Sequence, residues 1–527
     1  MKRLCSLIVL SLFIAGCASP KPPADLVGRA LDAMGGTEAL AKLKSLSLKG
    51  TVRQADPEQA FEPDGESWHT SSEFELTADL PAQVFRIDWV KSYTLPFPVK
   101  RAFSEIVTPQ AGYVLGVDTM LRNKQSLANN PPAHAMSGLR VATNQRELLR
   151  ASPSLLLEMQ RHPRDVRARS DVAVAGVLHP ALDYAVGQVT YTVVFDPQTA
   201  LPIRIRTMDH DNIWGDVTYD LVLSDWRMVD GVRIPARRVY ELRGKPVQEV
   251  QLTQLAINVP IDAAQFEPPA AIKAGAAVPA TGHNHHQWVI RRQFIGTYVD
   301  SDDPGFDNRA MSSLRLDEVA PGVQFVVGGS HNSLIVEMSD HLIVFDAPVS
   351  DGQSRWTLAA AKAKYPGKPV RTLVLTHHHM DHAGGLRTYV AQGATLVVGK
   401  GSARHFREVL SASFTHNPDL AATDLSRAAI MEVSDKQTFS DGRRVVSVHL
   451  VENPHAAGML IGYVADQRLG WVTDLWLPGA PLPQKITPLL SSVVNGVKKA
   501  GIAPVRFAGG HGSIAPYAPL EALATAN

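Results

Sequence analysis

Apolar residues recur with different spacings along this 527-residue chain. Between residues 26 and 43 they fall on one face of a predicted helix, which Gly35-Gly36 interrupts. From residue 46 to about 266 they alternate with polar residues in short runs, which predicts a large antiparallel sheet. The clearest runs are 84–89, 189–195, 203–207 and 217–223, with turns predicted at Asp196-Pro197 and Asp230-Gly231.

The second half of the chain has a different pattern. Strands are predicted at 323–327, 333–338, 341–345, 371–376, 395–398, 445–451, 459–464 and 469–473, and helices at 354–364, 386–391 and 487–501. Strands and helices interspersed in this way are typical of an α/β domain whose sheets are covered on both faces. We therefore expect two domains, residues 26–266 and 291–527.

Residues 267–290 are rich in Pro, Ala and Gly and show neither helical nor strand periodicity, so we expect a linker there. His283, His285 and His286 could capture a metal ion. A flexible tether fixes no ligand geometry, so we expect solvated histidines outside any site.

The N-terminus predicts export and attachment. Residues 1–16 combine a charged start, an apolar stretch too short to span a membrane and a small-residue end, as secretory signals do. Ile14-Ala15-Gly16-Cys17 resembles the bacterial lipobox, which implies cleavage before Cys17 and a lipid on that residue. An ordinary signal cleaved elsewhere is the alternative. Residues 17–25 would be a tether, and Ala18 suggests by analogy a bacterial outer-membrane lipoprotein that faces the periplasm.

Composition narrows the possible partners. The 2 cysteines are Cys5 and Cys17, so the rest of the chain can form no disulfide and offers no thiolate. The 52 Lys and Arg residues balance 51 Asp and Glu residues, and this formal charge of +1 gives no support to nucleic-acid binding. Membrane attachment would depend on the acyl chains, and the partner expected in solution is a small-molecule substrate. The oligomeric state is not predicted.

Metal-binding side chains crowd into one segment, Thr376 to Gly385, which directly follows the apolar residues 373–375. Imidazole and carboxylate groups are preferred zinc ligands, and the carboxyl edge of an α/β sheet is a rigid place to hold them. His377 and His379 can point in one direction, while Asp381 and His382 point to a neighbouring position. This spacing favours two metal ions.

The string His-x-His-x-Asp-His resembles the motif of the metallo-β-lactamase fold superfamily, over roughly residues 315 to 515. That resemblance implies an αββα sandwich and three later ligands, which His455, Asp474 and His511 supply. It implies that His377, His379 and His455 hold one zinc ion, that Asp381, His382 and His511 hold the other, and that Asp474 bridges them with a hydroxide. Asp346 matches the acidic position that supports the ligand-bearing segment from Thr376 to Gly385, which we call the metal loop.

The resemblance implies hydrolysis by that hydroxide. Two zinc ions lower the pKa of a shared water, and Asp381 is the predicted catalytic residue that orients it and relays a proton. An Asp at position 474 resembles the thioester, lactone, phosphodiester and sulfatase branches more than true β-lactamases. We therefore expect an ester, thioester, lactone or phosphodiester-type substrate, with β-lactamase activity as an alternative. A zinc ion that only stabilises the fold would need four ligands rather than seven.

A carrier is the remaining alternative. The N-terminal helix, the strands and the segments 195–202 and 229–235 resemble lipoprotein-carrier-like half-barrels of bacterial envelopes. This implies an α+β antiparallel domain that could bind an apolar ligand, with the zinc domain secondary. Among the other histidines, His378, His405, His416 and His449 are expected outside the site, whereas His331 in a Gly-rich turn is a candidate substrate contact.

Overall fold

The computed structural model describes residues 23–94, 98–118, 131–273, 286–287, 313–329, 331–416, 418 and 424–526. The predicted signal peptide, Cys17, His283 and His285 lie outside these residues. Within the described ranges, no helix has both the length and the hydropathy needed to cross a membrane.

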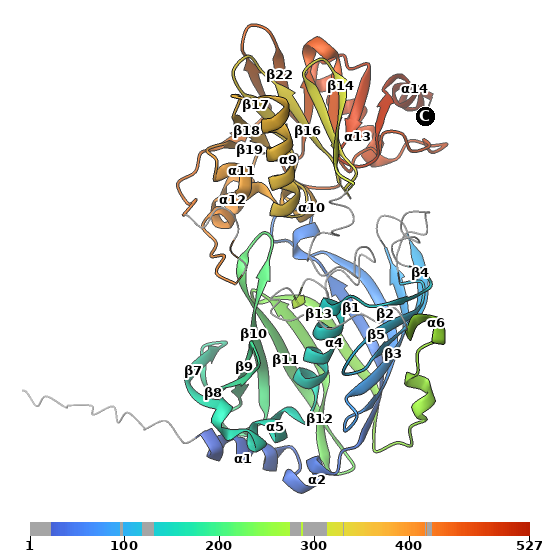
Figure 1. The fold of residues 1–527 in the computed structure, drawn as a ribbon, viewed down its shortest axis with the longest axis vertical. Helices are drawn as coiled ribbons and strands as arrows, with labels where there is room; N and C mark the ends of the chain where they lie inside the picture. The colour runs from blue at the N-terminus through green and yellow to red at the C-terminus, as the bar shows by residue number, and fades with distance from the viewer. Residues whose placement is uncertain are drawn as a thin grey trace, which may run out of the picture.

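The N-terminal half is built on one large antiparallel sheet (Figure 1). Among the described residues it has 13 strands in the order β6-β5-β4-β3-β2-β1-β13-β12-β11-β10-β9-β8-β7. They are β1 (Ser45–Ala55), β2 (Trp68–Asp79), β3 (Val84–Tyr93), β4 (Val99–Val107), β5 (Gly112–Gly116), β6 (Ala133–Ala135), β7 (Val166–Val174), β8 (Val177–Val186), β9 (Val189–Phe195), β10 (Pro202–Asp211), β11 (Gly215–Val229), β12 (Val232–Leu242) and β13 (Lys245–Ile257). Strand β1 pairs with both β2 and β13. The first and the last strand of this domain along the chain are therefore neighbours in the middle of the sheet.

Short helices accompany this sheet. They are α1 (Pro23–Ala33), α2 (Thr37–Ala41), α4 (Gly138–Ala151), α5 (Leu155–Arg161) and α6 (Ala270–Lys273), with single 3-10 turns at Pro57–Gln59, Pro163–Asp165 and Ala263–Phe266. The predicted break at Gly35-Gly36 is confirmed, because both glycines have positive φ between α1 and α2. A Cβ on Gly35 would lie 2.0 Å from the carbonyl oxygen of Gly231, so only glycine fits at this approach.

Helices α4 and α5 interrupt the region in which only strands were predicted. The buried side of α4 includes Arg140, Arg146 and Arg150, so an apolar stripe does not mark this helix. Arg140 pairs with Glu105 on β4, and Arg146 pairs with Asp209 on β10. The helix is therefore held against the sheet by buried ion pairs, which hydrophobic periodicity cannot reveal.

The C-terminal half contains two further sheets. One has 7 strands in the order β14 to β20 and the other has 6 in the order β21 to β26, counted over the described residues. The strands are β14 (Arg315–Ala320), β15 (Val323–Val327), β16 (Ser333–Glu337), β17 (Leu342–Phe345), β18 (Val370–Val374), β19 (Thr395–Gly399), β20 (Ile430–Val433), β21 (Lys436–Ser440), β22 (Val445–Leu450), β23 (Leu460–Val464), β24 (Leu469–Val472), β25 (Arg506–Gly509) and β26 (Ile514–Pro516). All eight strands predicted in this half are present, and β17 to β20 are parallel.

Helices flank both sheets. They are α9 (Asp351–Lys364), α10 (Met380–Ala383), α11 (Leu386–Val390), α12 (Ala403–Leu410), α13 (Pro488–Ala500) and α14 (Ala518–Ala526), with a 3-10 turn at Ala465–Gln467. Buried residues of the two sheets, such as Phe345 and Trp471, form one core between them. The outer face of the second sheet packs with Val493 and Val497 of α13 in another core. The arrangement is a helix–sheet–sheet–helix sandwich.

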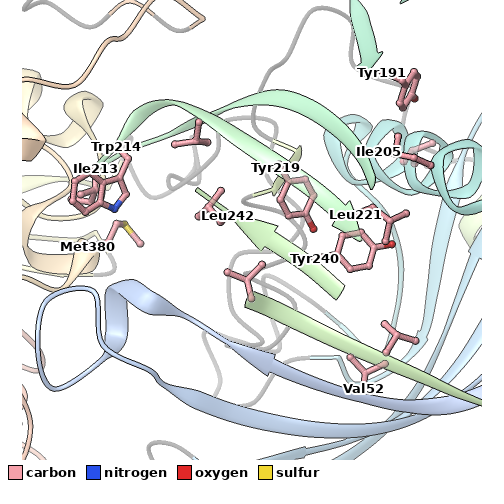
Figure 2. Packing of buried hydrophobic residues seen from close by; sticks show 14 of the residues in the cluster. Val52, Tyr191, Ile205, Ile213, Trp214, Tyr219, Leu221, Tyr240, Leu242 and Met380 are labelled. Atoms are coloured by element: carbon pink, nitrogen blue, oxygen red, sulfur yellow. The ribbon is translucent and has the colours of Figure 1, made fainter. Parts of the chain in front are cut away.

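The two halves share a continuous hydrophobic core. It extends from the N-terminal sheet to Met380 and other residues around the metal loop. Figure 2 shows Ile213 and Trp214, from the turn between β10 and β11, beside Met380. In the same turn, the Asn212 side chain donates a hydrogen bond of 2.9 Å to the carbonyl oxygen of Val349. The N-terminal half therefore supports the metal loop directly.

The expectation that His286 is solvated is wrong. The His286 side chain is buried, and its Nδ1 lies 2.9 Å from Thr143 Oγ1. The backbone amides of His286 and Gln287 donate to the carboxylate of Asp209. This part of the segment is docked on the N-terminal domain because a buried carboxylate needs the donors that these amides supply.

Candidate metal centre

The metal loop follows β18 at the carboxyl edge of the parallel strands. The backbone amide and the hydroxyl of Thr376 donate to Asp346 Oδ1 over 2.7 and 2.9 Å. Asp346 directly follows β17, and its Oδ2 lies 3.4 Å from Nδ1 of His382. The structure thus places Asp346 behind the loop, where it fixes the loop backbone and orients a candidate ligand.

The seven predicted ligands converge in space. His377, His379 and His455 form one group whose candidate ligand atoms lie within 4.8 Å of one another. His382 and His511 bring their Nε2 atoms to 3.2 Å and form a second group with Asp381. They come from segments that are distant in the sequence and meet only at this edge of the sandwich.

Asp474 lies between the two groups. Its Oδ2 is 3.2 Å from Nε2 of His377 and 3.0 Å from Nε2 of His382, and its Oδ1 is 2.8 Å from Nε2 of His511. Its backbone has a φ of 48°, a left-handed conformation that is uncommon for a non-glycine residue. This carboxylate is therefore placed to contact ions in both groups.

His331 joins the second group. Its Nε2 lies 3.1 Å from Asp381 Oδ2, and its ring centroid is 4.4 Å from that of His511. The turn that carries it is fixed by Asn332, whose amide group donates to the carbonyl oxygens of Gly509 and Gly512. The sequence indicated His331 only as a candidate substrate contact; the structure places it among the candidate ligands.

Burial determines the protonation of several of these groups. Burial lowers the pKa of His377 well below its usual value and lowers the pKa of His379 and His331 to about 4. Neutral imidazole is the form that binds a metal ion. Burial opposes charge on His382, but the carboxylates of Asp474 and Asp381 outweigh it and raise the pKa of this histidine.

The donor set fits metal ions. Burial favours the neutral form of Asp381 and Asp474, yet nearby histidines, His382 foremost, hold the pKa of both carboxyl groups well below the usual range. Within the described residues, the buried atoms His377 Nε2 and His455 Nε2 make no hydrogen bond and lie 3.2 and 3.4 Å from Asp474 Oδ2. Buried polar atoms without hydrogen bonds are costly, and a cation shared with Asp474 would satisfy both nitrogens.

The other histidines lie outside the candidate ligand groups. His378 is buried and turns toward the N-terminal half, where its Nε2 lies 3.0 Å from the carbonyl oxygen of Ala60. His405 packs edge-on against Trp214, and His449 lies 2.9 Å from the hydroxyl of Ser447. The backbone amide of His416 donates to Asp216.

Two further contacts come from the N-terminal half and were not predicted. The Gln59 side chain donates to Asp381 Oδ1 over 2.8 Å, and the carbonyl oxygen of Ala60 lies 2.9 Å from Nε2 of His379. Gln59 and Asp381 are 322 positions apart. Nothing in the local pattern of residues 56–67 marks them, because one is an ordinary loop glutamine and the other acts through its backbone.

Comparison with known proteins agrees with the motif. Residues 326–469 match the family model described as Metallo-beta-lactamase superfamily, so the C-terminal region carries a domain of this superfamily. A curated relative, 2,4-dinitroanisole O-demethylase subunit alpha from Nocardioides sp. (strain JS1661), is 32% identical over 72 residues, which are 14% of this chain and 22% of the relative. The match spans about a fifth of that protein's length.

Solved structures with partial similarity include proteins of different activities. A stereoselective inverting sec-alkylsulfatase from Pseudomonas sp. is 16% identical with a TM-score of 0.31, covering 40% of each chain. The flavodiiron protein from Giardia intestinalis is 16% identical with a TM-score of 0.30, covering 40% of this chain and 58% of that one. A metallo-beta-lactamase from Pontibacter korlensis is 17% identical with a TM-score of 0.31, covering 41% of this chain and 100% of that one.

Proposed function

We propose that this chain is a hydrolase that binds two zinc ions and acts on an ester, thioester, lactone or phosphodiester-type substrate. The observation that carries the proposal is the convergence of two ligand groups on one bridging carboxylate, Asp474. Zinc ions bound there would supply Lewis acidity and a hydroxide nucleophile near neutral pH. A zinc ion with a purely structural role would need only four protein ligands, which leave no coordination position open for water or substrate.

The chain's own residues have separate parts in this proposal. Asp381 accepts one hydrogen bond at each carboxylate oxygen, so its orientation is fixed for receiving a proton from the attacking water and passing it to the leaving group. His377 and His382 form the closed side of the site, with side chains that are 0% exposed. His455 and His511 are 25% and 23% exposed, so substrate approaches along their edge.

Two exposed apolar residues lie on segments that are hydrogen-bonded to the segments of His455 and His511. Phe61 and Leu477 are each 47% exposed. The carbonyl oxygen of Phe61 accepts a hydrogen bond from the amide of Ala457, two residues beyond His455. Leu477 is followed by Pro478, whose carbonyl oxygen accepts from the amide of Ser513, two residues beyond His511. These positions favour substrates that carry an acyl or aryl group beside the bond to be broken.

The carrier alternative receives less support. A hollow of about 690 Å³ lies on the N-terminal sheet, but Lys49, Glu73 and Asp88 line it together with Phe74 and Trp89. An apolar ligand bound there would remove these charged side chains from water, which costs free energy. We propose that the N-terminal domain serves the zinc domain instead, and that a lipid on Cys17 holds the protein at the periplasmic side of the outer membrane.

Metal analysis combined with a substrate panel tests this function. The full chain is stripped of metal, reloaded with zinc and assayed on aryl and acyl esters, thioesters, lactones, phosphodiesters and a chromogenic β-lactam. We expect about two zinc ions per chain and zinc-dependent turnover of one of the first four classes. Absence of bound transition metal after reloading would refute the proposal, and turnover of the β-lactam alone would establish the alternative activity.

A further inference from the structure

The loop between β1 and β2, residues 56–67, reaches from the N-terminal sheet to the metal centre. Three consecutive residues of this loop each contact a segment that bears candidate ligands. Gln59 donates to Asp381, the carbonyl oxygen of Ala60 lies within hydrogen-bond distance of His379, and that of Phe61 accepts from Ala457. Ala60 is only 2% exposed, so the loop is seated against the C-terminal half.

Internal hydrogen bonds hold the loop in this shape. Asp56 accepts from the amide of Glu58 through its side chain, and its own amide donates to the carbonyl oxygen of Ser67. The hydroxyl of Ser67 donates to the carbonyl oxygen of Gln59 over 3.0 Å. These hydrogen bonds hold the two ends of the loop together. They also fix the turn that carries Gln59, so its side chain is positioned for the contact with Asp381.

The contact at Ala60 selects one ring form of His379. A carbonyl oxygen only accepts hydrogen bonds, so the Nε2 atom that faces it at 2.9 Å carries the proton. The proton-free nitrogen of the neutral ring is then Nδ1, which is the atom available to a metal ion. A backbone carbonyl that orients a ligating histidine in this way is a common outer partner of metal sites.

The contact at Gln59 fixes Asp381 from the opposite side to His331. The amide of Gln59 lies 2.8 Å from Oδ1 and Nε2 of His331 lies 3.1 Å from Oδ2. With both oxygens engaged, the carboxylate has little freedom to rotate. Loss of the Gln59 amide would release one oxygen and leave a partly buried carboxylate with fewer partners.

We propose that the β1–β2 loop is a built-in part of the metal centre, with Gln59 as a positioning residue for Asp381 and the Ala60 carbonyl as the group that selects the ring form of His379. This inference rests on the proposed function. It assigns the N-terminal domain a role in the zinc site itself, in addition to any role in presenting substrate.

Variants of Gln59 in the full chain test this role. Gln59→Ala removes the donor, and Gln59→Glu keeps the size but places a second carboxylate beside Asp381. Gln110→Ala is the control, because Gln110 is an exposed glutamine of the same domain in the β4–β5 turn. Zinc affinity is measured by competition with a chromophoric chelator, ligand geometry by the visible absorption of the cobalt(II)-substituted protein, and kcat and KM on the substrate found in the panel.

We expect Gln59→Ala to lower zinc affinity and kcat by about tenfold each, with a changed cobalt spectrum and little change in KM, because outer partners of metal ligands typically contribute 10- to 100-fold. Gln59→Glu should be more severe, and Gln110→Ala should match the parent. Thermal melts identify any variant that is unfolded, and Gln59→Asn then replaces it.

The outcomes separate this inference from the proposed function. If the parent binds no zinc, the proposed function fails. If the parent binds zinc and hydrolyses its substrate, but Gln59→Ala and Gln59→Glu keep zinc affinity, cobalt spectrum and kcat within twofold of the parent, the positioning role of Gln59 is wrong.

Discussion

Replacing Trp214 by alanine should weaken both halves of the protein and the candidate metal centre beside their shared core. Trp214 is 6% exposed and lies beside Met380 in the core that both halves share (Figure 2). Removing a buried tryptophan costs about 3–5 kcal/mol. The guanidinium of Arg243 lies 3.4 Å from the centre of its ring, a contact that adds about 0.5–2 kcal/mol.

This loss is large against the marginal stability of a protein domain, about 5–15 kcal/mol. Met380 lies between His379 and Asp381, so the cavity left by the indole ring adjoins the metal loop. We therefore expect Trp214→Ala to lower the urea midpoint of unfolding, measured by circular dichroism, and to lower zinc affinity in the same protein.

Trp226→Ala is the matched control for this prediction. Trp226 lies on β11, the strand that begins directly after Trp214, but beside Met34 and Pro235 of the N-terminal half. It should lower stability without changing zinc affinity. Coupling between this core and the metal loop is refuted if Trp214→Ala loses stability while its zinc affinity equals that of the parent, or if the two variants change zinc affinity equally.

Four further substitutions have separate expected outcomes. Asp381→Asn should reduce kcat far more than the melting temperature with some zinc retained, because the amide lacks the charge that accepts a proton; near-parent turnover at equal zinc content would contradict this role. Asp474→Asn should lower zinc content first in elemental analysis, because the carboxylate contacts both groups. His331→Ala should weaken the second of two zinc-binding steps in a titration, and equal affinities in variant and parent would exclude it as a ligand or ligand partner. Cys17→Ser should move the protein from the membrane fraction to the soluble fraction on centrifugation, and continued sedimentation with membranes would argue against a lipid anchor.

Much of the C-terminal fold could be predicted because its signals are local. The strand at 323–327 has the bounds predicted from a short apolar run, since all five of its residues are buried. The candidate ligands could be predicted because a metal site requires particular side chains, and four of them lie within six consecutive positions after one strand. The ligand motif directly follows the strand that positions it, so the motif indicates both the candidate site and this part of the fold.

The polar interior of the N-terminal domain was harder to predict. Helix α4 buries three arginines whose partners lie on distant strands, and His286 is docked by a carboxylate of β10. Hydrophobic periodicity detects apolar burial alone, because it scores charged residues as exposed. A helix buried through ion pairs and a histidine buried through backbone donors therefore both resemble solvated segments in the sequence.

The contacts across the two halves have no sequence signal for a further reason. At His379 the contributing group is the carbonyl oxygen of Ala60, which any residue type possesses, so the identity of the side chain carries no information about the contact. What matters there is the position of the backbone, which depends on the length and internal hydrogen bonds of the β1–β2 loop. A side-chain motif can therefore indicate the candidate ligands, but the residues that contact them from the other half become visible only when the folded N-terminal domain is placed against the metal loop.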